Sequence, residues 1–296
     1  MKNMKKKKTR NTVNRQDNKH SFLFWLAIPV LLFWVSLGYV IGLFRESRLN
    51  PEGNATATSV VLSHFQEYES VPENLDKPVI TFWFDDAWLS QYMNAYPILK
   101  TQGFSAAVGV PTSAVEAPNY VNWSQLRILQ ENGWEITNHS VSHNCEMDSW
   151  NEEAVLNEYQ KSKLILWKNK LASDIFVSPC GVDSEIMRSA AKKMFLGYRT
   201  VDPGYNELSG VDFYDLKVQN VTNQTKFSDV KQWVDETKDN NYWLIIVFHK
   251  VGEISKTLND DEFNVTIDNF KDIVSYVKEQ EIQVVIPSQI LQAKIQ

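Results

Sequence analysis

The sequence of 296 residues has no repeat of Gly-X-Y triplets and no other internal repeat, and it contains only five histidines and two cysteines. Without the Gly-X-Y repeat the chain is not collagen-like. Its content of 43% apolar residues is too high for a wholly disordered chain. Basic side chains are also scarce after the N-terminus, since residues 45–296 carry 22 of them against 35 acidic ones, a net charge of −13. So acidic a domain suits the nucleic-acid phosphate backbone poorly, and we expect no nucleic-acid partner.

The N-terminal segment is basic, and an uncharged apolar run follows it. Residues 1–20 carry eight basic side chains and one acidic one, and the 23 residues from Phe22 to Phe44 contain no charged side chain. As a helix, this run would be about 35 Å long, against about 30 Å for the hydrocarbon core of a bilayer. A cleaved signal peptide is disfavoured, because the apolar region of a signal peptide spans only about 7–15 residues and no Ala-x-Ala site stands near the end of this run. A buried core helix is disfavoured by the length.

We therefore predict a transmembrane signal-anchor over residues 21–44, preceded by a basic cytoplasmic tail over residues 1–20. Cations before the span favour a cytoplasmic N-terminus, which places the acidic remainder outside the cell. Residues 45–76 are polar and mixed, as in a stalk. A folded domain is predicted for residues 77–296.

Within that domain, short β-type runs alternate with helical patterns. Such alternation over about 215 residues favours a parallel sheet covered by helices, and about seven repeats favour a distorted (β/α)7-type barrel. A capping box from Ser149 to Glu152 is expected to open a long helix, and further helices are expected near Asp183, Ser228 and Thr266. The strands are predicted at Val79–Phe84, Phe104–Val110, Trp134–Thr137, Ile175–Val177, Leu196–Thr200, Tyr242–Phe248 and Ile282–Ile286.

Three of these strands end in residues that can bind metal or move protons. Asp85 and Asp86 follow the first strand, His139 and His143 follow the third, and His249 follows the Tyr242–Phe248 strand. In a barrel of this kind, the loops after the carboxyl ends of the strands form the active site. We therefore expect these five side chains to meet.

Their chemistry suits a hydrolase. Two imidazoles four residues apart share one face of a helical turn, and with a carboxylate they form a competent zinc site with an open position. The second aspartate can then act as a base and His249 as an acid, for hydrolysis of an amide or ester. Taken singly, each feature has a simpler explanation: a His-x-x-x-His pair on a solvated turn, aspartates that cap a helix, or a hydrogen-bonded histidine.

The motifs resemble those of the polysaccharide deacetylases of carbohydrate esterase family 4, the NodB homology domain. Val79 to Trp88 (VITFWFDDAW) resembles the first motif, Phe-Asp-Asp-Gly, and His139 to His143 (HSVSH) the second, His-Ser/Thr-x-x-His. Ser178 to Gly181 (SPCG) occupies the place of the third motif, Arg-x-Pro-Tyr-Gly, and Phe248-His249 fits the last. The resemblance covers about residues 77–291.

The resemblance implies a role for each of these positions. Asp85 would be the catalytic base and His249 the general acid. The backbone N–H of Cys180 would help to stabilise the oxyanion. The metal ligands, for a divalent ion that is usually zinc, would be Asp86, His139 and His143.

Several positions depart from the family pattern. Ala87 replaces the glycine of the first motif, and Val177 stands where the family often has an arginine that holds the catalytic base, an arginine also absent from exopolysaccharide (poly-N-acetylglucosamine) deacetylases. Arg199 is a possible substitute, although we expect it in a surface ion pair. Asp202 is our candidate for orienting His249, with a plain turn aspartate as the alternative. Trp88 is expected to face the pocket.

Cys145 and Cys180 both fall on predicted site loops. In an exported domain they can form a disulfide, stay as two reduced thiols, or supply a thiolate to the metal, and the sequence does not decide.

We expect a membrane-anchored extracellular deacetylase that takes N-acetyl groups from poly-N-acetylglucosamine or peptidoglycan. The alternatives are a catalytically silent glycan-binding relative and an esterase for O-acetyl groups.

Overall fold

The computed structural model describes residues 77–252 and 262–295 of the chain. The predicted basic tail, signal-anchor and stalk all lie outside these described residues and stay predictions. Among the helices that are described, none is both long and apolar enough to cross a bilayer.

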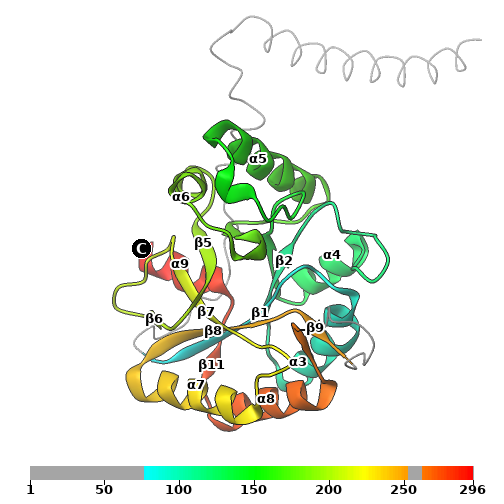
Figure 1. Cartoon of the computed structure of the whole chain (residues 1–296). Helices are drawn as coiled ribbons and strands as arrows, with labels where there is room; N and C mark the ends of the chain where they lie inside the picture. Colours follow the sequence, from blue (N-terminus) through cyan, green and yellow to red (C-terminus); the bar gives the residue numbers. More distant parts are fainter. Residues whose placement is uncertain (1–76, 253–261, 296) are drawn as a thin grey trace, which may run out of the picture. The chain divides into compact units, whose positions relative to one another are not determined.

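The described residues form a closed parallel barrel with helices around it (Figure 1). Six neighbouring pairs run in parallel, and β1 also pairs with β8 along its whole length, from Val79 opposite Trp243 to Phe84 opposite Phe248, which closes the barrel. The fold class predicted from the alternation of strands and helices therefore agrees with the described domain. The barrel strands, in spatial order, are β1 (Val79–Phe84), β2 (Ala107–Val110), β3 (Glu135–Asn138), β4 (Ile175–Val177), β5 (Gly197–Pro203), β7 (Leu216–Asn220) and β8 (Tyr242–Phe248).

Four shorter strands lie beside the barrel. The strand β11 (Gln283–Val284) pairs with the start of β1, and β6 (Asn206–Glu207) runs antiparallel to β8. The pair β9 (Lys250–Val251) and β10 (Asn264–Val265) follows the carboxyl end of β8.

Helices connect the strands and cover the outside of the barrel (Figure 1). Among the described residues they include two 3₁₀ turns and one π-helical turn, which begins five residues after Asp86. In chain order the helical elements are η1 (Gln91–Ala95, π), α3 (Tyr96–Gln102), α4 (Trp123–Glu131), η2 (Met147–Ser149, 3₁₀), α5 (Glu152–Lys168), η3 (Pro179–Gly181, 3₁₀), α6 (Glu185–Lys192), α7 (Phe227–Asn240), α8 (Ile267–Glu279) and α9 (Pro287–Ile295).

Alternation along the strands separates two hydrophobic layers. In β1, Phe82 and Phe84 pack outward against helix residues such as Phe270, whereas Val79 and Trp83 pack inward with residues of the facing strands. Because successive side chains of a strand point to opposite faces, every second residue of a barrel strand faces the interior. This alternation also decides which polar side chains at the strand ends face the barrel axis.

Several predicted elements need correction. The strand β7 was not predicted, and the last predicted strand, Ile282–Ile286, is the short β11 rather than a barrel strand. The capping box from Ser149 to Glu152 is wrong, because Asn151 is the N-cap of α5 and its side chain accepts from Ala154 N–H. The helix α9 was also not predicted.

A buried carboxyl group joins α9 to the barrel and should make stability depend on pH. Glu135 is buried on β3 and accepts hydrogen bonds from the N–H (2.9 Å) and hydroxyl (2.5 Å) of Ser288. Burial, with a smaller effect of the nearby charge of Asp174, raises the pKa of Glu135 to about 8, even though the bonds from Ser288 favour the carboxylate.

Because the folded state holds this proton more tightly than the unfolded chain, the contribution of Glu135 to stability is fully present below about pH 4.5 and is lost progressively up to about pH 8. We expect Glu135→Gln to remove this fall. The measurement is urea unfolding of parent and variant from pH 5 to 9, where the variant should gain on the parent as the pH rises. Parallel curves would contradict the assignment.

Candidate active site

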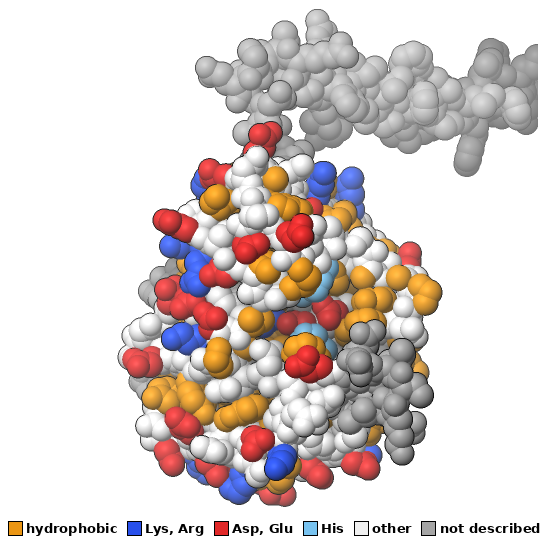
Figure 2. All heavy atoms as spheres, in the orientation of Figure 1, with side chains coloured by type: hydrophobic (Ala, Val, Ile, Leu, Met, Phe, Trp, Pro, Cys, Tyr) orange, Lys and Arg blue, Asp and Glu red, His pale blue; other side chains and the backbone are white. Residues whose placement is uncertain are grey.

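Four functional side chains come from inward-facing positions of four strands. Asp85 continues the inward series of β1 after Trp83, His249 that of β8, and His139 that of β3. Arg199 lies on β5 directly beside Val177 of β4, which also faces inward. Parallel strands carry such residues to one end of the barrel, where histidine and acidic side chains gather near the middle of the face shown in Figure 2.

The backbone turns sharply at these strand ends. Asp86 (φ 72°) and Ala87 (φ 57°) adopt left-handed conformations, so the position where the family motif has glycine keeps a conformation that favours glycine. His143 (φ 51°) and Cys180 (φ 52°) do the same. Left-handed conformations of residues other than glycine are costly, and such conformations recur at functional sites.

Space beside Asp85 depends on a glycine of β2. A Cβ atom at Gly109 would lie 3.2 Å from Oδ1 of Asp85 and 3.5 Å from Cγ of His139. The absence of a side chain at Gly109 therefore lets the first and third strands bring these two residues together.

The two histidines lie on an irregular loop, not on the helical turn that we predicted. Their rings are nevertheless adjacent, with centroids 4.7 Å apart in an edge-to-face arrangement. Nδ1 of His139 lies 3.0 Å from the carbonyl oxygen of Val177. A proton on Nδ1 satisfies that contact and leaves the lone pair of Nε2 free for a metal.

The spacing of the three predicted ligands fits a tetrahedral metal ion. Oδ1 of Asp86 lies 3.4 Å from Nε2 of His139 and 3.1 Å from Nε2 of His143. Two ligands at about 2.0–2.1 Å from a tetrahedral ion are separated by about 3.3 Å, whereas charge-assisted hydrogen bonds are typically about 2.7–2.9 Å. The structure thus brings together three donors that a zinc ion prefers.

The electrostatics also favour a cation at this point. Burial raises the pKa of Asp86, but its close contacts with His139 and His143, with the charges of His139 and His249, hold it well below its usual range. Burial lowers the pKa of His143, but its hydrogen bond and charge contact with Asp86 and the charge of Asp85 raise it overall. Each partner thus attracts positive charge, which a divalent ion can supply in place of protons.

Asp85 is held by Arg199, and our expectation of a surface ion pair for Arg199 is wrong. The arginine is fully buried, and its Nη2 lies 2.6 Å and 2.5 Å from the two carboxylate oxygens of Asp85. Since Val177 and Arg199 are register partners on parallel strands, their side chains share a face. Arg199 can therefore reach the place that an arginine at position 177 would occupy.

His249 faces Asp85 at a distance of 3.9 Å between Nε2 and Oδ2. Burial lowers the pKa of His249, and the charges of Asp85 and Asp86 offset part of this effect. Our candidate for orienting this ring is wrong, because Asp202 is exposed on β5 and no described residue forms a hydrogen bond with Nδ1. The ring instead packs against Phe263, with centroids 4.7 Å apart.

Trp88 lies beside the site and contacts Asp86, one of the three predicted metal ligands. Its Nε1 donates a hydrogen bond to Oδ2 of Asp86 (3.1 Å), which leaves Oδ1 for the histidines. Its ring stacks on Tyr120 with centroids 4.2 Å apart, and Nζ of Lys250 lies 4.4 Å from the ring centroid. Trp88 therefore orients the carboxylate, and two side chains already contact its ring.

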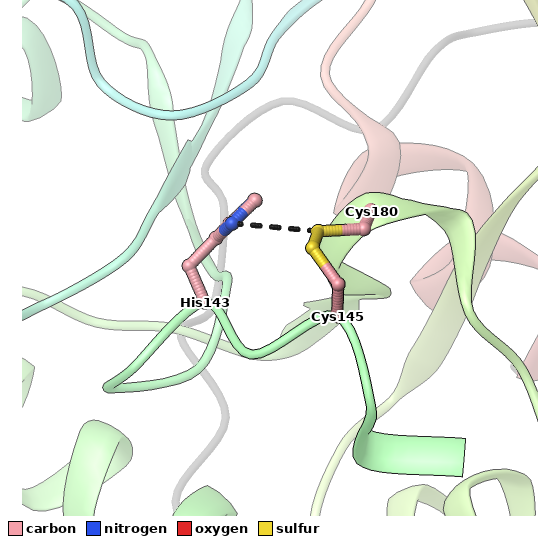
Figure 3. Close-up of side chains that lie close together, drawn as sticks. All are labelled: His143, Cys145 and Cys180. Carbon is pink, nitrogen blue, oxygen red and sulfur yellow. Dashed lines mark hydrogen bonds between the residues drawn. A yellow bond between two sulfur atoms is a disulfide. The ribbon is translucent and has the colours of Figure 1, made fainter.

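Cys145 and Cys180 form a disulfide, which resolves the alternatives that the sequence left open. The bond joins the loop after β3 to the 3₁₀ turn η3 after β4, and Sγ of Cys180 lies 3.7 Å from Nδ1 of His143 (Figure 3). Bonded sulfurs are not thiolates, so the cysteines are not metal ligands in this state.

A glutamate on α5 fixes the loop that carries the histidines. Oε1 of Glu158 accepts from the backbone N–H groups of Val141 (3.0 Å) and Ser142 (2.7 Å) and from the hydroxyl of Ser142 (2.7 Å). Sequence reasoning missed Glu158, because nothing in the pattern of α5 distinguishes it from the other glutamates of that helix.

We expect Glu158→Ala to weaken zinc binding about 10–100-fold, the usual effect of removing a group that orients metal ligands. Isothermal titration calorimetry of the metal-stripped protein measures this directly. The matched control is Glu153→Ala on the exposed face of the same helix, which should bind zinc like the parent. Equal affinities for both variants would contradict the role of Glu158.

Residues 73–201 match the family model described as polysaccharide deacetylase. YxkH of Bacillus subtilis strain 168, named as a candidate polysaccharide deacetylase, is 27% identical over 126 residues. That match covers 41% of this chain and 44% of YxkH, so it spans less than half of the relative.

Two solved structures have similar folds. One is a carbohydrate esterase family 4 pseudoenzyme from Bacillus anthracis, with 16% identity, a TM-score of 0.51, and coverage of 74% of this chain and 66% of that one. The other is a family 4 acetyl xylan esterase from Clostridium thermocellum in complex with a cobalt ion, with 14% identity, a TM-score of 0.51, and coverage of 73% and 91%.

Residues 73–201 are therefore similar to the polysaccharide deacetylase family, and the described domain shares its fold with the two carbohydrate esterase family 4 structures.

Proposed function

We propose that this protein is a metal-dependent hydrolase that removes N-acetyl groups from a cell-surface polysaccharide, either poly-N-acetylglucosamine or peptidoglycan. The observation that carries the proposal is the convergence of Asp86, His139 and His143, at the spacing of metal ligands, beside a buried carboxylate and a facing imidazole. The similarity of residues 73–201 to the polysaccharide deacetylase family model supports the same reaction class.

Asp86, His139 and His143 would hold the metal, and Asp85 would act as the base. A divalent ion such as zinc supplies polarisation of the acetyl carbonyl and a more acidic water. Asp85 takes a proton from the attacking water, and its contact with Arg199 keeps the carboxylate oriented.

His249 would protonate the leaving amine. Its Nε2 lies 3.9 Å from Oδ2 of Asp85, so the group that accepts a proton is close to the group that delivers one. The backbone N–H of Cys180, on the turn after β4, is the proposed donor to the oxyanion.

The proposed location rests on the sequence. An uncharged run over residues 21–44 behind a basic N-terminus favours a single-pass anchor in the cell membrane with the catalytic domain outside. Residues 21–44 would then be in contact with the lipid bilayer, and the domain would meet glycans at the cell surface.

The test is acetate release by the full-length protein in detergent, from N-acetylglucosamine oligomers and from peptidoglycan. We expect release that stops with a chelator and returns with added zinc, and that is lost in Asp85→Asn. Release unaffected by chelation would contradict the metal site.

Two other outcomes would identify the alternatives. Acetate released from acetylated xylan but not from the N-acetylated polymers would indicate an O-acetyl esterase. Glycan binding without any acetate would indicate a silent relative, although binding alone needs no carboxylate base beside a metal site.

A further inference from the structure

Gln91 is a fully buried polar residue that the reaction described above does not use. It is the first residue of the π-helical turn η1, which follows the site residues of β1. Pro97, in the first turn of α3, has no N–H to donate, and the N–H of Tyr96 donates to the carbonyl of Gln91 five residues earlier. Such wide turns often occur at functional sites.

The amide group of Gln91 joins the backbones of the two proposed proton-transfer residues. Its Nε2 donates to the carbonyl oxygen of Asp85 (2.5 Å) and to that of His249 (2.8 Å). Since both neighbours are acceptors, only the NH₂ end of the amide fits between them. Oε1 is buried and has no hydrogen-bond partner among the described residues, so the orientation that serves these two carbonyls leaves the oxygen unsatisfied.

These two hydrogen bonds of Gln91 lie where the pairing between β1 and β8 ends. The ladder between β1 and β8 continues one bond beyond the strands, from Asp85 N–H to the carbonyl of Phe248 (2.9 Å). The ladder ends there, because the N–H of Lys250 donates to the carbonyl of Phe263 (3.2 Å). Gln91 connects the chains where the ladder ends.

We infer that Gln91 is a positioning residue that sets the separation between the side chains of Asp85 and His249. The inference rests on the proposed function, since it assigns Gln91 to the base and acid of that reaction. A displacement of about 1 Å between reacting groups can lower a rate by about 10²-fold.

The chain offers a matched control on the same turn. Nδ2 of Asn94 donates to the carbonyl of Val251 (2.6 Å), so it also ties η1 to the chain after β8, but not at a reacting residue. We expect Gln91→Met to lower kcat for acetate release about 10–100-fold with KM within about twofold. Asn94→Leu should leave kcat within about twofold, with a similar shift of the urea midpoint.

A double-mutant cycle separates positioning from a general loss of structure. In a His249→Ala background, Gln91→Met should reduce the residual rate by less than about twofold, because the residue that it positions is already gone. An equal fold-loss in both backgrounds, or an equal loss for Asn94→Leu, would overturn the inference.

Crystal structures of the parent and Gln91→Met give a readout that needs no activity. The variant should show a separation between Nε2 of His249 and Oδ2 of Asp85 longer than 3.9 Å, and an unchanged separation would overturn the inference. If Asp85→Asn releases acetate at the parent rate, the proposed function fails. If Asp85→Asn is inactive and Gln91→Met matches the parent, only the role of Gln91 fails.

Discussion

Arg199→Met should lower the free energy of unfolding by about 3–5 kcal/mol and abolish acetate release. The substitution keeps an unbranched side chain but leaves Asp85, only 3% exposed, without its partner, and breaking a buried ion pair costs about this much. The variant must either bury an unpaired carboxylate or keep it protonated, and neither state provides an oriented base. Urea unfolding and the acetate assay measure the two effects.

Arg188→Met is the matched control. Arg188 also pairs with two carboxylates, Asp183 at 2.6 Å and Asp215 at 2.9 Å, but these side chains are 27–29% exposed. Partly solvated pairs contribute much less, so we expect a loss of about 1 kcal/mol or less and unchanged acetate release. Equal losses of stability in the two variants would contradict a special role for the buried pair.

The position of Arg199 shows what sequence reasoning lacked. An arginine inside an apolar strand is an unusual residue, and that signal was present in the sequence. Its direction depends on the register between β4 and β5, which pairs Arg199 with Val177. Register is set by long-range packing, so the sequence alone suggested the exposed alternative.

The fold was predicted to a large extent because its signals are local. Apolar runs such as Val79–Phe84, Ile175–Val177 and Tyr242–Phe248 coincide with β1, β4 and β8. The strand β7 (Leu216–Asn220) was missed, since its sequence LKVQN contains only two apolar residues. Its inward-facing Leu216 and Val218 become buried only when the barrel closes around them.

The site was predicted in its residue types and meeting place, because parallel strands carry their end residues to one edge. The structure brings Asp85, Asp86, His139, His143 and His249 together, and their catalytic roles stay predictions. The residues that hold them in place could not be predicted. Glu158 contacts backbone groups of the loop after β3, and Gln91 reaches the carbonyl of His249, far away in the sequence, and such contacts leave no motif.

Removing the disulfide should lower stability by about as much as Arg199→Met does. In Cys145→Ser/Cys180→Ser, the free energy of unfolding should fall by about 4 kcal/mol, the chain-entropy value for the 35-residue separation of the two cysteines. We also expect weaker zinc binding, because Cys145 is two residues from His143 and Sγ of Cys180 contacts the ring of His143. Urea unfolding and calorimetric zinc titration test the two parts.

The parent protein treated with a dithiol reductant is the control that separates the crosslink from the change of side chain. If the crosslink is the cause, reduced parent and double variant should unfold at the same urea concentration, both below the oxidised parent. Reduced cysteines, however, restore two thiols beside His143, which can themselves bind zinc. For zinc affinity the serine variant is therefore the better readout, because it lacks both the crosslink and the thiols. Zinc affinity equal to that of the oxidised parent would show that the disulfide does not position His143.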